Sequence, residues 1–432
     1  MSFPRYASYK PSGVEWVGEV PEHWSLMPLK RIGNFRAGSG FPHDAQGVAD
    51  AELSFHKVNS LAQADADGYL TPSANSVSHE KAAELRAVVF PPETIVFAKI
   101  GAALLLGRVR RLRAPSCLDN NMMGFTVRPP SSAGYFRYAF HQLRFDYLAN
   151  PGAVPSLNEE QIRRLCIAVP PDQEQRTIVA FLDRETAKID ALVDEQKRLI
   201  ALLKEKRQAV ISHAVTKGLD PNAPMKDSGI EWLGDVPAHW EVGPLKRFTD
   251  FLDGKRVPLS AEERSARGGA FPYYGASGII DWIDDYIFDE ECVLVAEDGA
   301  NLLSRSTPIA FVANGRYWVN NHAHILRPHD QMSTYWAARI EAIDVSPWVT
   351  GAAQPKLTAD ALANLSVAVP PTREERERIE EVIRTVAISL QPLICEAERA
   401  VWLLAERRAA LISAAVTGKI DVRGAVSIEA AA

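Results

Sequence analysis

Arginine side chains gather in one short stretch near the end of the first quarter of the chain. The segment GRVRRLR, from Gly107, places Arg108, Arg110, Arg111 and Arg113 in partial alternation with apolar residues, as on one face of a strand. Guanidinium groups bind phosphates and read base edges, so this spacing predicts a contact with DNA. A solvated edge strand whose charges block aggregation is the alternative interpretation.

Basic and aromatic residues elsewhere could join such a surface. Two Lys-Arg pairs recur at matching places in two related segments, and phosphates suit a repeated contact because they carry no sequence information. Two adjacent tyrosines could touch sugar or base, although such pairs are also typical of cores and hairpins. Besides the stretch above, the candidates for DNA contact are Lys30, Arg31, Arg36, Lys99, Lys246, Arg247, Lys255, Arg256, Tyr273, Tyr274, Arg305 and Arg316.

Two asparagine pairs, Asn120-Asn121 and Asn320-Asn321, could read adenine, because the asparagine amide can bond that base bidentately. The pairs recur in two segments that otherwise differ widely. A side chain that reads bases should differ between segments with different targets. We therefore favour a shared structural role for both pairs.

Motifs of catalysis are missing from the sequence or lack their context. The [DN]PP[YF] loop of adenine methyltransferases and the phosphate loop GxxxxGK[ST] do not occur. FRAGSG, from Phe35, is glycine-rich but lacks the downstream acid and the strand–loop–helix setting of a cofactor site. Glu195 and Lys197 have the spacing of a nuclease ExK motif, yet a solvated helical face explains them. We expect no catalytic residue in this chain.

A metal site is not expected either. The cysteines Cys117, Cys166, Cys292 and Cys395 are scattered without CxxC spacing, which also fits a reducing, cytoplasmic setting. His213 has no histidine at the repeated position, so we interpret it as an exposed residue. No apolar run approaches the ~18 residues of a membrane span, and the start, MSFPRYASYKPSG, lacks a signal-peptide core.

The elements that must position these residues come in two copies. SGVEWVGEVPEHWSLMPLKR begins at Ser12 and SGIEWLGDVPAHWEVGPLKR at Ser228, a shift of 228 − 12 = 216, half of the 432 residues. Such a period indicates a domain-sized unit made twice. The duplicated tryptophans are interpreted as packing that fixes each opening segment to its domain: Trp16, Trp24, Trp232 and Trp240.

A second pair of repeats predicts two long helices. LCIAVPPDQEQR, from Leu165, returns as LSVAVPPTREER from Leu365. Each proline pair opens a stretch rich in helix formers, 172–216 and 372–417, with Gly218 and Gly418 as stops. Pro392 predicts a kink or break. Heptad-like stripes favour pairing of the helices with each other over packing on their own domains. The stripes are Ile178, Leu182, Ile189, Leu192, Leu199, Leu203 and Val210, then Ile379, Ile383, Val386, Leu390, Leu393, Ala397, Ala400, Leu404 and Leu411.

The segments between the helices mix short β-like runs with Gly, Pro and Asn. They share only a thin skeleton: AKIGA at Ala98 with AEDGA at Ala296, and GAVPSLN at Gly152 with GAAQPKLT at Gly351. The net charge is −6, with 24% charged residues, which looks unfavourable for a DNA binder. Because the acids concentrate in the helices and the C-terminal region, the distribution of charge is more informative than the total.

This order of parts resembles the specificity subunit of type I restriction–modification systems. The resemblance rests on both copies of three motifs: the SG-EW-G-VP-HW openings, the AVPP helix starts and the ISxAVT helix ends. It implies an α+β fold with two β-rich target recognition domains, separated by two long antiparallel helices in an intramolecular coiled coil with an approximate two-fold. The implied segments are 1–165 and 219–365 as recognition domains, 166–218 and 366–424 as spacer helices, and 425–432 as a disordered tail.

The resemblance also implies the function. Each recognition domain would read one half of an asymmetric, bipartite DNA target, and the helices would set the spacer and dock methyltransferase subunits. Methylation and cleavage would belong to two methyltransferase and two restriction subunits, which would bind S-adenosylmethionine, ATP and Mg²⁺. The alternatives are a self-contained DNA-modifying enzyme and a coiled-coil scaffold whose β-rich domains bind proteins.

Overall fold

The computed structural model describes residues 3–14, 18–65, 67–129, 131–141, 143, 145–150, 152, 154–351 and 354–425. The chain forms two compact units. Unit 1 comprises residues 1–196 together with 399–432, and unit 2 comprises residues 197–398. The compact units therefore cut across the segments expected from the sequence, because the end of the chain joins the first unit. The expected tail lies, apart from Ala425, outside the described residues.

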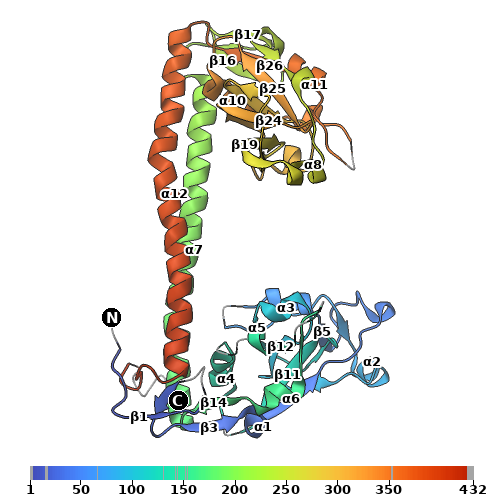
Figure 1. Ribbon diagram of the computed structural model, residues 1–432, viewed down its shortest axis with the longest axis vertical. Coiled ribbons are helices and arrows are strands. Elements are labelled where there is room, and N and C mark those ends of the chain that lie inside the picture. The colour runs from blue at the N-terminus through green and yellow to red at the C-terminus, as the bar shows by residue number, and fades with distance from the viewer. Residues whose placement is uncertain are drawn as a thin grey trace. The chain divides into compact units, whose positions relative to one another are not determined.

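Two long helices contribute a segment to each unit (Figure 1). They are α7 (Asp172–Lys217) and α12 (Arg373–Val416), each of which follows a Pro-Pro pair. Gly218 and Gly418 follow the helix ends with φ of 81° and 71°, a left-handed conformation that glycine adopts without strain. These bounds confirm the predicted spans. The predicted break is wrong, because α12 continues through Pro392.

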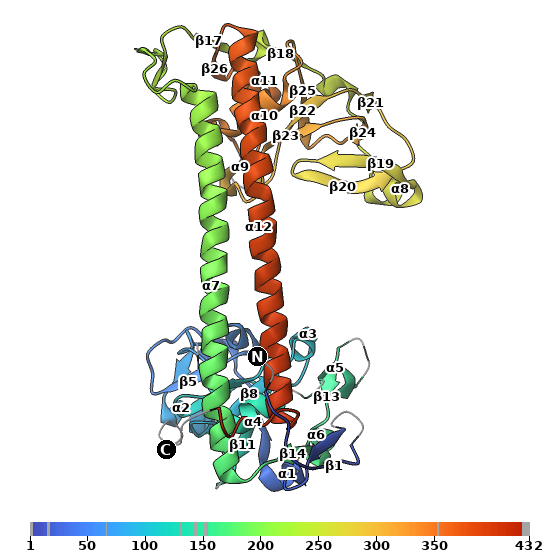
Figure 2. The ribbon, with the colours of Figure 1, turned by 90° about the vertical axis from the view of Figure 1, so that its left-hand side faces the viewer.

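Within each unit, the start of one helix packs with the end of the other. In unit 1, Ile178 of α7 and Val416 of α12 share one core; in unit 2, Val215 of α7 and Ile379 of α12 do the same. Both views show the two helices running side by side inside each unit (Figures 1 and 2). Early residues of one helix thus meet late residues of the other. The predicted antiparallel pairing is confirmed within both units.

A polar contact between the helices is repeated in the two units. In unit 1, Nε of Arg408 lies 2.9 Å from Oδ1 of Asp190. In unit 2, Nη1 of Arg207 donates a hydrogen bond of 2.8 Å to Oε1 of Gln391. The offsets agree, since 408 − 207 = 201 and 391 − 190 = 201. The duplication therefore preserves the helix register as well as the sequence.

The seam between the helices differs in part from the predicted stripe. On α7, Leu192 and Leu199 are exposed, the latter by 42%. On α12, Leu393 is 47% exposed and Ile394, at 1%, takes its place. The half-buried residues of α7 that follow steps of three and four are Val193, Gln196, Ile200, Leu203 and Arg207. Because the seam includes Gln196 and Arg207, the positions of apolar residues alone do not reveal it. The predicted stripe is therefore wrong by one residue at Leu192, Leu199 and Leu393. Val210 is also exposed.

The other residues of the predicted stripes are confirmed as buried or half-buried. They are Ile178, Leu182, Ile189, Leu203, Ile379, Ile383, Val386, Leu390, Ala397, Ala400, Leu404 and Leu411.

Unit 1 builds its β-rich domain from two four-stranded sheets. The first has the order β4-β11-β8-β9, with β4 (Gly33–Ala37), β11 (Met122–Val127), β8 (Ile95–Ala98) and β9 (Arg110–Arg111), and all neighbours antiparallel. The second has the order β6-β5-β10-β7, with β6 (Ser76–Val77), β5 (Leu53–His56), β10 (Ser116–Leu118) and β7 (Val89–Phe90). Helix α4 (Ala133–Phe140) covers the first sheet.

Unit 2 follows the same plan. Its first sheet has the order β18-β25-β22-β23, with β18 (Thr249–Phe251), β25 (Ala323–Pro328), β22 (Cys292–Ala296) and β23 (Ala310–Ala313). Its second has the order β20-β19-β24-β21, with β20 (Gly278–Ile283), β19 (Gly268–Gly275), β24 (Arg316–Val319) and β21 (Phe288–Asp289). Helix α10 (Ser333–Glu341) takes the place of α4.

The central strands explain why each domain is a layered body. Every residue of β8 (IVFA) and of β22 (CVLVA) is buried. Alternate side chains point to opposite faces of a strand. Accordingly, Phe97 packs in the core with α4, while Val96 packs with Phe90 of the second sheet. Val295 packs with α10, and Leu294 packs with Tyr317 of the second sheet.

Each unit also contains further short helices and strands. In unit 1 they are β1 (Tyr9–Pro11), β2 (Glu19–Pro21), β3 (Ser25–Pro28), α1 (Leu29–Ile32), α2 (His79–Glu84), α3 (Ala102–Leu105), α5 (Phe145–Leu148), β12 (Ala149–Asn150), β13 (Ser156–Leu157), α6 (Glu159–Arg164) and β14 (Cys166–Val169). In unit 2 they are β15 (Met225–Asp227), β16 (Asp235–Pro237), β17 (Glu241–Pro244), α8 (Ala261–Ala266), α9 (Asn301–Ser304), α11 (Ala359–Asn364) and β26 (Ser366–Val369). Across the described ranges, no helix combines the length and apolar character that crossing a membrane requires.

Candidate nucleic-acid interface

The duplicated opening motifs bind the first turn of the long helix that follows each domain. Trp24 donates its indole N–H to Oε1 of Glu174 at 3.0 Å, and His23 Nε2 lies 2.8 Å from Oε2 of the same carboxylate. In unit 2, Trp240 and His239 bond Glu375 at 2.9 Å each. Both indoles are buried. A buried indole N–H needs an acceptor, and the repeated glutamate supplies it.

The same tryptophans also touch the end of the other long helix. A Cβ added to Gly418 would lie 3.3 Å from the ring of Trp24, and one added to Gly218 would lie 3.4 Å from the ring of Trp240. The packing role predicted for Trp24 and Trp240 is confirmed. Trp232 instead is partly exposed and meets the ring of Trp348 edge-on at 5.1 Å. Trp16 lies outside the described residues.

The few sequence motifs that the two β-rich domains share form a loop clamp, in which one loop is hydrogen-bonded to another through the backbone. In unit 1, Gly101 N–H donates to Pro155 O and Leu157 N–H donates to Lys99 O, both at 2.8 Å. In unit 2, Gly299 N–H donates to Pro355 O at 2.9 Å, and Leu357 N–H donates to Glu297 O at 2.8 Å. The repeated AxxGA and P-x-L residues therefore hold one loop against another. This frame leaves the other surfaces free to differ.

The repeated asparagines belong to the turn before β11 and β25. Asn320 Oδ1 accepts the N–H of His322 at 2.8 Å, and in unit 1 Asp119 Oδ1 accepts the N–H of Asn121 at 2.8 Å. The structural role that we favoured is confirmed for Asn320. Its counterpart is Asp119 and not Asn120, so the two asparagine pairs are offset by one residue in the fold.

The basic stretch of unit 1 divides into two halves. Arg111 is buried; its Nη1 lies 2.9 Å from Oε2 of Glu93, and its guanidinium lies 4.1 Å from the ring centroid of Tyr69. The guanidinium of Arg113 lies 4.3 Å from the same ring centroid, and its Nη2 lies 2.6 Å from Oδ2 of Asp65. These contacts occupy Arg111, and its predicted DNA contact does not hold in this conformation. Arg108 is exposed and Arg110 is half-buried.

The other candidates of unit 1 lie at the surface. Lys30 and Arg31 are exposed on α1, and Arg36 is exposed on β4. Lys99 is half-buried beside the loop clamp. Their contact with DNA stays a prediction.

The candidates of unit 2 fall into an exposed set and an internal set. Lys246, Arg247, Lys255 and Arg316 are exposed, with Lys246 bonded to Asn364 and Arg316 to Asp289. Arg305 is half-buried and bonds Glu341. Tyr274 is half-buried against Phe311 and Tyr317. The prediction for Tyr273 does not hold, because this side chain is fully buried and its hydroxyl accepts the N–H of Leu259 at 2.9 Å.

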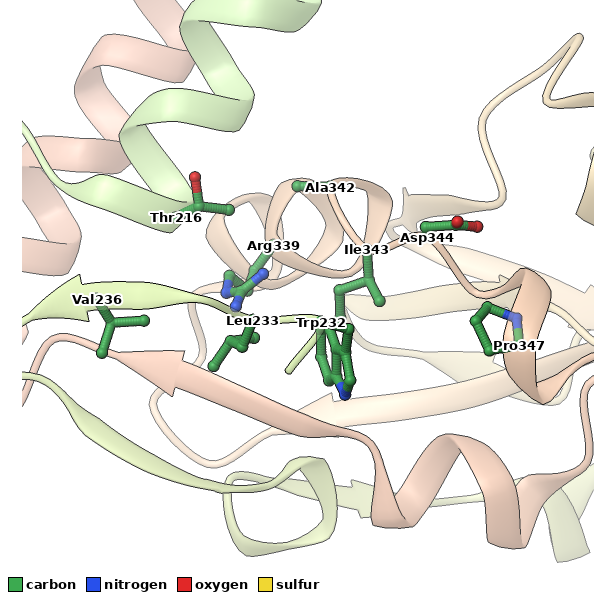
Figure 3. A pocket seen from close by; sticks show the side chains of 9 residues that line it. All are labelled: Thr216, Trp232, Leu233, Val236, Arg339, Ala342, Ile343, Asp344 and Pro347. Atoms are coloured by element: carbon green, nitrogen blue, oxygen red, sulfur yellow. The ribbon is translucent and has the colours of Figure 1, made fainter. Parts of the chain in front are cut away.

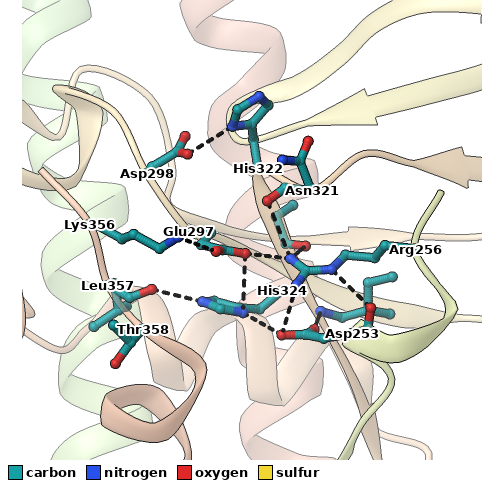
Figure 4. A network of polar contacts seen from close by, with 12 residues as sticks. Asp253, Arg256, Glu297, Asp298, Asn321, His322, His324, Lys356, Leu357 and Thr358 are labelled. Carbon is teal, nitrogen blue, oxygen red and sulfur yellow. Dashed lines mark hydrogen bonds and ion pairs between the residues drawn. The ribbon is translucent and has the colours of Figure 1, made fainter. Parts of the chain in front are cut away.

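Arg256 lies inside a charged network and is not free to meet DNA (Figure 4). It bonds Glu297 and donates to Ala323 O at 2.9 Å, while Lys356 Nζ lies 3.0 Å from the second oxygen of Glu297. His324 Nδ1 lies 2.6 Å from Asp253. The predicted DNA contact of Arg256 is therefore replaced by a structural role, because its donors are engaged within the domain.

Both ring nitrogens of His324 face acceptors. Nδ1 faces the Asp253 carboxylate, and Nε2 lies 2.8 Å from Leu357 O. Burial opposes the charge on Asp253, but the hydrogen bond and charge of His324 prevail and lower the pKa of Asp253. The ligand atoms of Asp253, Glu297 and His324 lie within 4.8 Å of one another. Arg256 pairs with both carboxylates and Lys356 with that of Glu297, so the group forms an ion-pair network.

A pocket of about 300 Å³ lies at the end of α7 in unit 2 (Figure 3). Its lining includes Trp232, Leu233 and the buried Arg339, whose Nε donates to Ala368 O at 3.2 Å. In unit 1, the hydroxyl of Tyr135 lies 3.0 Å from the matching carbonyl, Ala168 O. Burial lowers the pKa of Arg339. The pocket belongs to the frame that joins domain and helix.

A family model for the type I restriction modification DNA specificity domain matches residues 21–201 and 237–390. Those two matches span 181 + 154 = 335 of the 432 residues, one match to each repeated half. The chain belongs to this specificity-domain family.

The relatives of this specificity-domain chain carry the same description. A putative type I restriction enzyme specificity subunit, S.HindORF215P of Haemophilus influenzae, is 29% identical over 155 residues, or 35% of this chain and 36% of that protein. The match thus spans about a third of that relative. The putative MjaX specificity subunit of Methanocaldococcus jannaschii is 23% identical over 318 residues, covering 68% of this chain and 69% of the relative.

A solved structure shares the fold. It is described as showing the structural basis of complex assembly and conformational transition of the type I R-M system. The match has a TM-score of 0.59 and 15% identity, and it covers 92% of this chain and 98% of that one. The predicted α+β fold with two recognition domains and paired long helices is confirmed.

The specificity-domain frame contains residues that the sequence argument missed. Glu174 and Glu375 were not singled out, although they are the third and the fourth residue after their Pro-Pro pairs. His23 and His239 likewise precede the duplicated tryptophans. The signal was present, because a repeated acid after each helix start and a repeated His-Trp can satisfy each other. Asp65 and Glu93, which neutralise arginines, have no such repeat and gave no signal.

Proposed function

We propose that this chain is the DNA-recognition subunit of a type I restriction–modification complex. Each recognition domain reads one half of an asymmetric, bipartite target, and the long helices set the spacer between the halves. The proposal is supported by the contrast between the contacts that both units share and the surface residues in which they differ. The Trp–Glu locks and loop clamps recur in both units, whereas the basic residues of β9 have no basic counterparts on the matching strand of unit 2, β23. A conserved frame with unlike polar surfaces suits two readers of unlike sequences.

The partners in this proposal are two methyltransferase subunits and, in the full assembly, two restriction subunits. Apolar side chains left exposed on the helices support the docking of an apolar partner surface, since exposed apolar surface can mark an interaction site. In unit 2 these are Leu199, Leu202 and Leu393; in unit 1 they are Leu192, Trp402 and Leu403. The ion pair of Lys204 with Glu398 (3.6 Å) supports the antiparallel register beside them.

The chain itself performs no chemistry in this proposal. Adenine methylation and DNA cleavage, with S-adenosylmethionine, ATP and Mg²⁺, belong to the partner subunits. Support comes from the sequence, which contains neither a [DN]PP[YF] loop nor a GxxxxGK[ST] loop. A flipped adenine would therefore enter a partner's pocket.

Expression of the chain with a methyltransferase partner, followed by genome-wide mapping of methylated adenines, tests the proposal. We expect one bipartite motif with two different halves. Deleting one heptad from each long helix should shorten the spacer and leave the letters of both halves unchanged. Methyl transfer by the purified chain alone would reveal a self-contained enzyme. Absence of salt-dependent binding to any bipartite duplex would favour a protein scaffold instead.

A further inference from the structure

The four arginines of the 107–113 stretch face two different environments. Arg111 and Arg113 both lie against the ring of Tyr69 and are paired with Glu93 and Asp65. Arg108 and Arg110 have no ion pair with any carboxylate among the residues that the structure describes. Two of the four arginines are therefore paired with carboxylates, and the other two, Arg108 and Arg110, are not.

Arg110 is surrounded by like charge. Its Nη1 donates to the carbonyl of Val109 at 3.0 Å, and its Nε is buried without a partner. Burial, together with the positive charges of Arg108, Arg408 and Arg137, lowers the pKa of Arg110. These neighbours come from the loop before β9, from α12 and from α4. The domain and the helix pair of unit 1 thus contribute cations to one place.

The carboxylates at this place leave an excess of positive charge. Arg137 Nη2 lies 2.8 Å from Asp183, and Arg408 Nε lies 2.9 Å from Asp190. Four arginines against two aspartates leave 4 − 2 = 2 positive charges. A half-buried guanidinium among like charges with an unmade hydrogen bond is costly unless an anion joins it. Arg108 is exposed, so the group opens to the surface.

We propose that Arg108 and Arg110 bind the phosphodiester backbone of DNA. The inference rests on the proposed function and adds to it, since it assigns these two arginines to affinity and register and not to the reading of bases. Guanidinium groups bind phosphate through paired, charge-assisted hydrogen bonds. Phosphates recur along each strand, so two neighbouring arginines can each find one.

Binding of the full chain, with its methyltransferase partner, to a cognate duplex and to a scrambled duplex tests the inference. The variants are Arg108→Gln and Arg110→Gln, and Arg113→Gln is the control because its guanidinium is already paired with Asp65 and is 61% exposed. For each of the first two, we expect the slope of log K against log salt to decrease in magnitude by ~0.9, the value for one lost phosphate contact. Both duplexes should lose affinity by the same factor. The control should keep the slope.

Several outcomes would overturn the inference. An unchanged slope in both variants would do so, and so would a loss confined to the cognate letters, which would make these arginines base readers. Stabilisation of the wild-type chain by inorganic phosphate that Arg110→Gln abolishes, with the DNA slope intact, would assign a small-anion site. If Arg110→Gln fails to fold, Arg108→Gln and Arg110→Lys remain, and the latter should keep the slope. Failure of the proposed function is distinct, because the wild-type chain would then not distinguish the two duplexes.

Discussion

Trp24 and Glu174 form a buried hydrogen bond of 3.0 Å that ties the opening segment of the chain to the first turn of α7. The carboxylate of Glu174 also accepts a hydrogen bond from Tyr6 at 2.6 Å, whereas the partners of the Glu375 carboxylate among the described residues are Trp240 and His239. The two units therefore share one lock, which is reinforced in unit 1. This lock fixes the direction in which each recognition domain leaves its helix.

Replacing either glutamate should loosen its own unit. Glu174→Ala leaves the N–H of Trp24 and the hydroxyl of Tyr6 without acceptors, and we expect a loss of ~2–4 kcal/mol in the free energy of unfolding of unit 1. Glu375→Ala should cost unit 2 about 1–3 kcal/mol. Amide hydrogen exchange resolved by segment measures both. Gln173→Ala, at an exposed position of the same turn, is the control. Equal losses of stability in Gln173→Ala and Glu174→Ala would contradict the role of the lock.

His56 should make unit 1 sensitive to mild acid. This side chain is buried on β5, and burial lowers its pKa from 6.5 to about 4. The unfolded chain then binds the proton at a higher pH than the folded chain does. Stability is thus full above pH 6.5, declines as the pH falls toward 4, and loses about 3 kcal/mol at 1.36 kcal/mol per pH unit. Urea unfolding from pH 7.5 to 4.5 measures the slope, which His56→Gln should flatten.

The network around His324 should respond only to stronger acid. The pKa values of Asp253 and Glu297 are both lowered in the folded chain, against the effect of burial, by hydrogen bonds from His324 and from Arg256 and Lys356. A depressed carboxyl pKa stabilises the fold above the unfolded value and loses that effect as the pH falls through the folded value. Unit 2 should therefore weaken below about pH 4. Asp253→Asn should remove part of this acid transition, and an unaltered transition would mean that the network contributes little.

The repeated contact between the helices can be improved in unit 2. Arg408 meets an aspartate in unit 1, whereas Arg207 meets the neutral Gln391. Gln391→Glu is isosteric and should add an exposed ion pair, with a gain of ~0.2–1 kcal/mol that fades in high salt. Asp190→Asn should cost unit 1 a similar amount. Chemical unfolding at low and high salt compares them, and a salt-independent gain would point to packing and not to charge.

The two-copy plan could be predicted from the sequence because it depends on local signals. Prolines before α7 and α12 start the helices, and Gly218 and Gly418 end them, since these residues act on their own backbone. The packing of Trp24 and Trp240 could be predicted as well, because the tryptophans recur in both copies while the surfaces around them diverge.

Tertiary structure alone decided which charges are free. Arg108, Arg110, Arg111 and Arg113 are equivalent in the sequence, yet two are neutralised beside Tyr69 and two face other arginines. The seam of α7 likewise passes through Gln196 and Arg207 and leaves Leu199 outside. A residue's own type sets its charge and its local backbone preference. Its burial and its ionic partners depend on side chains that the fold brings from distant parts of the chain, such as Asp65 and Arg408.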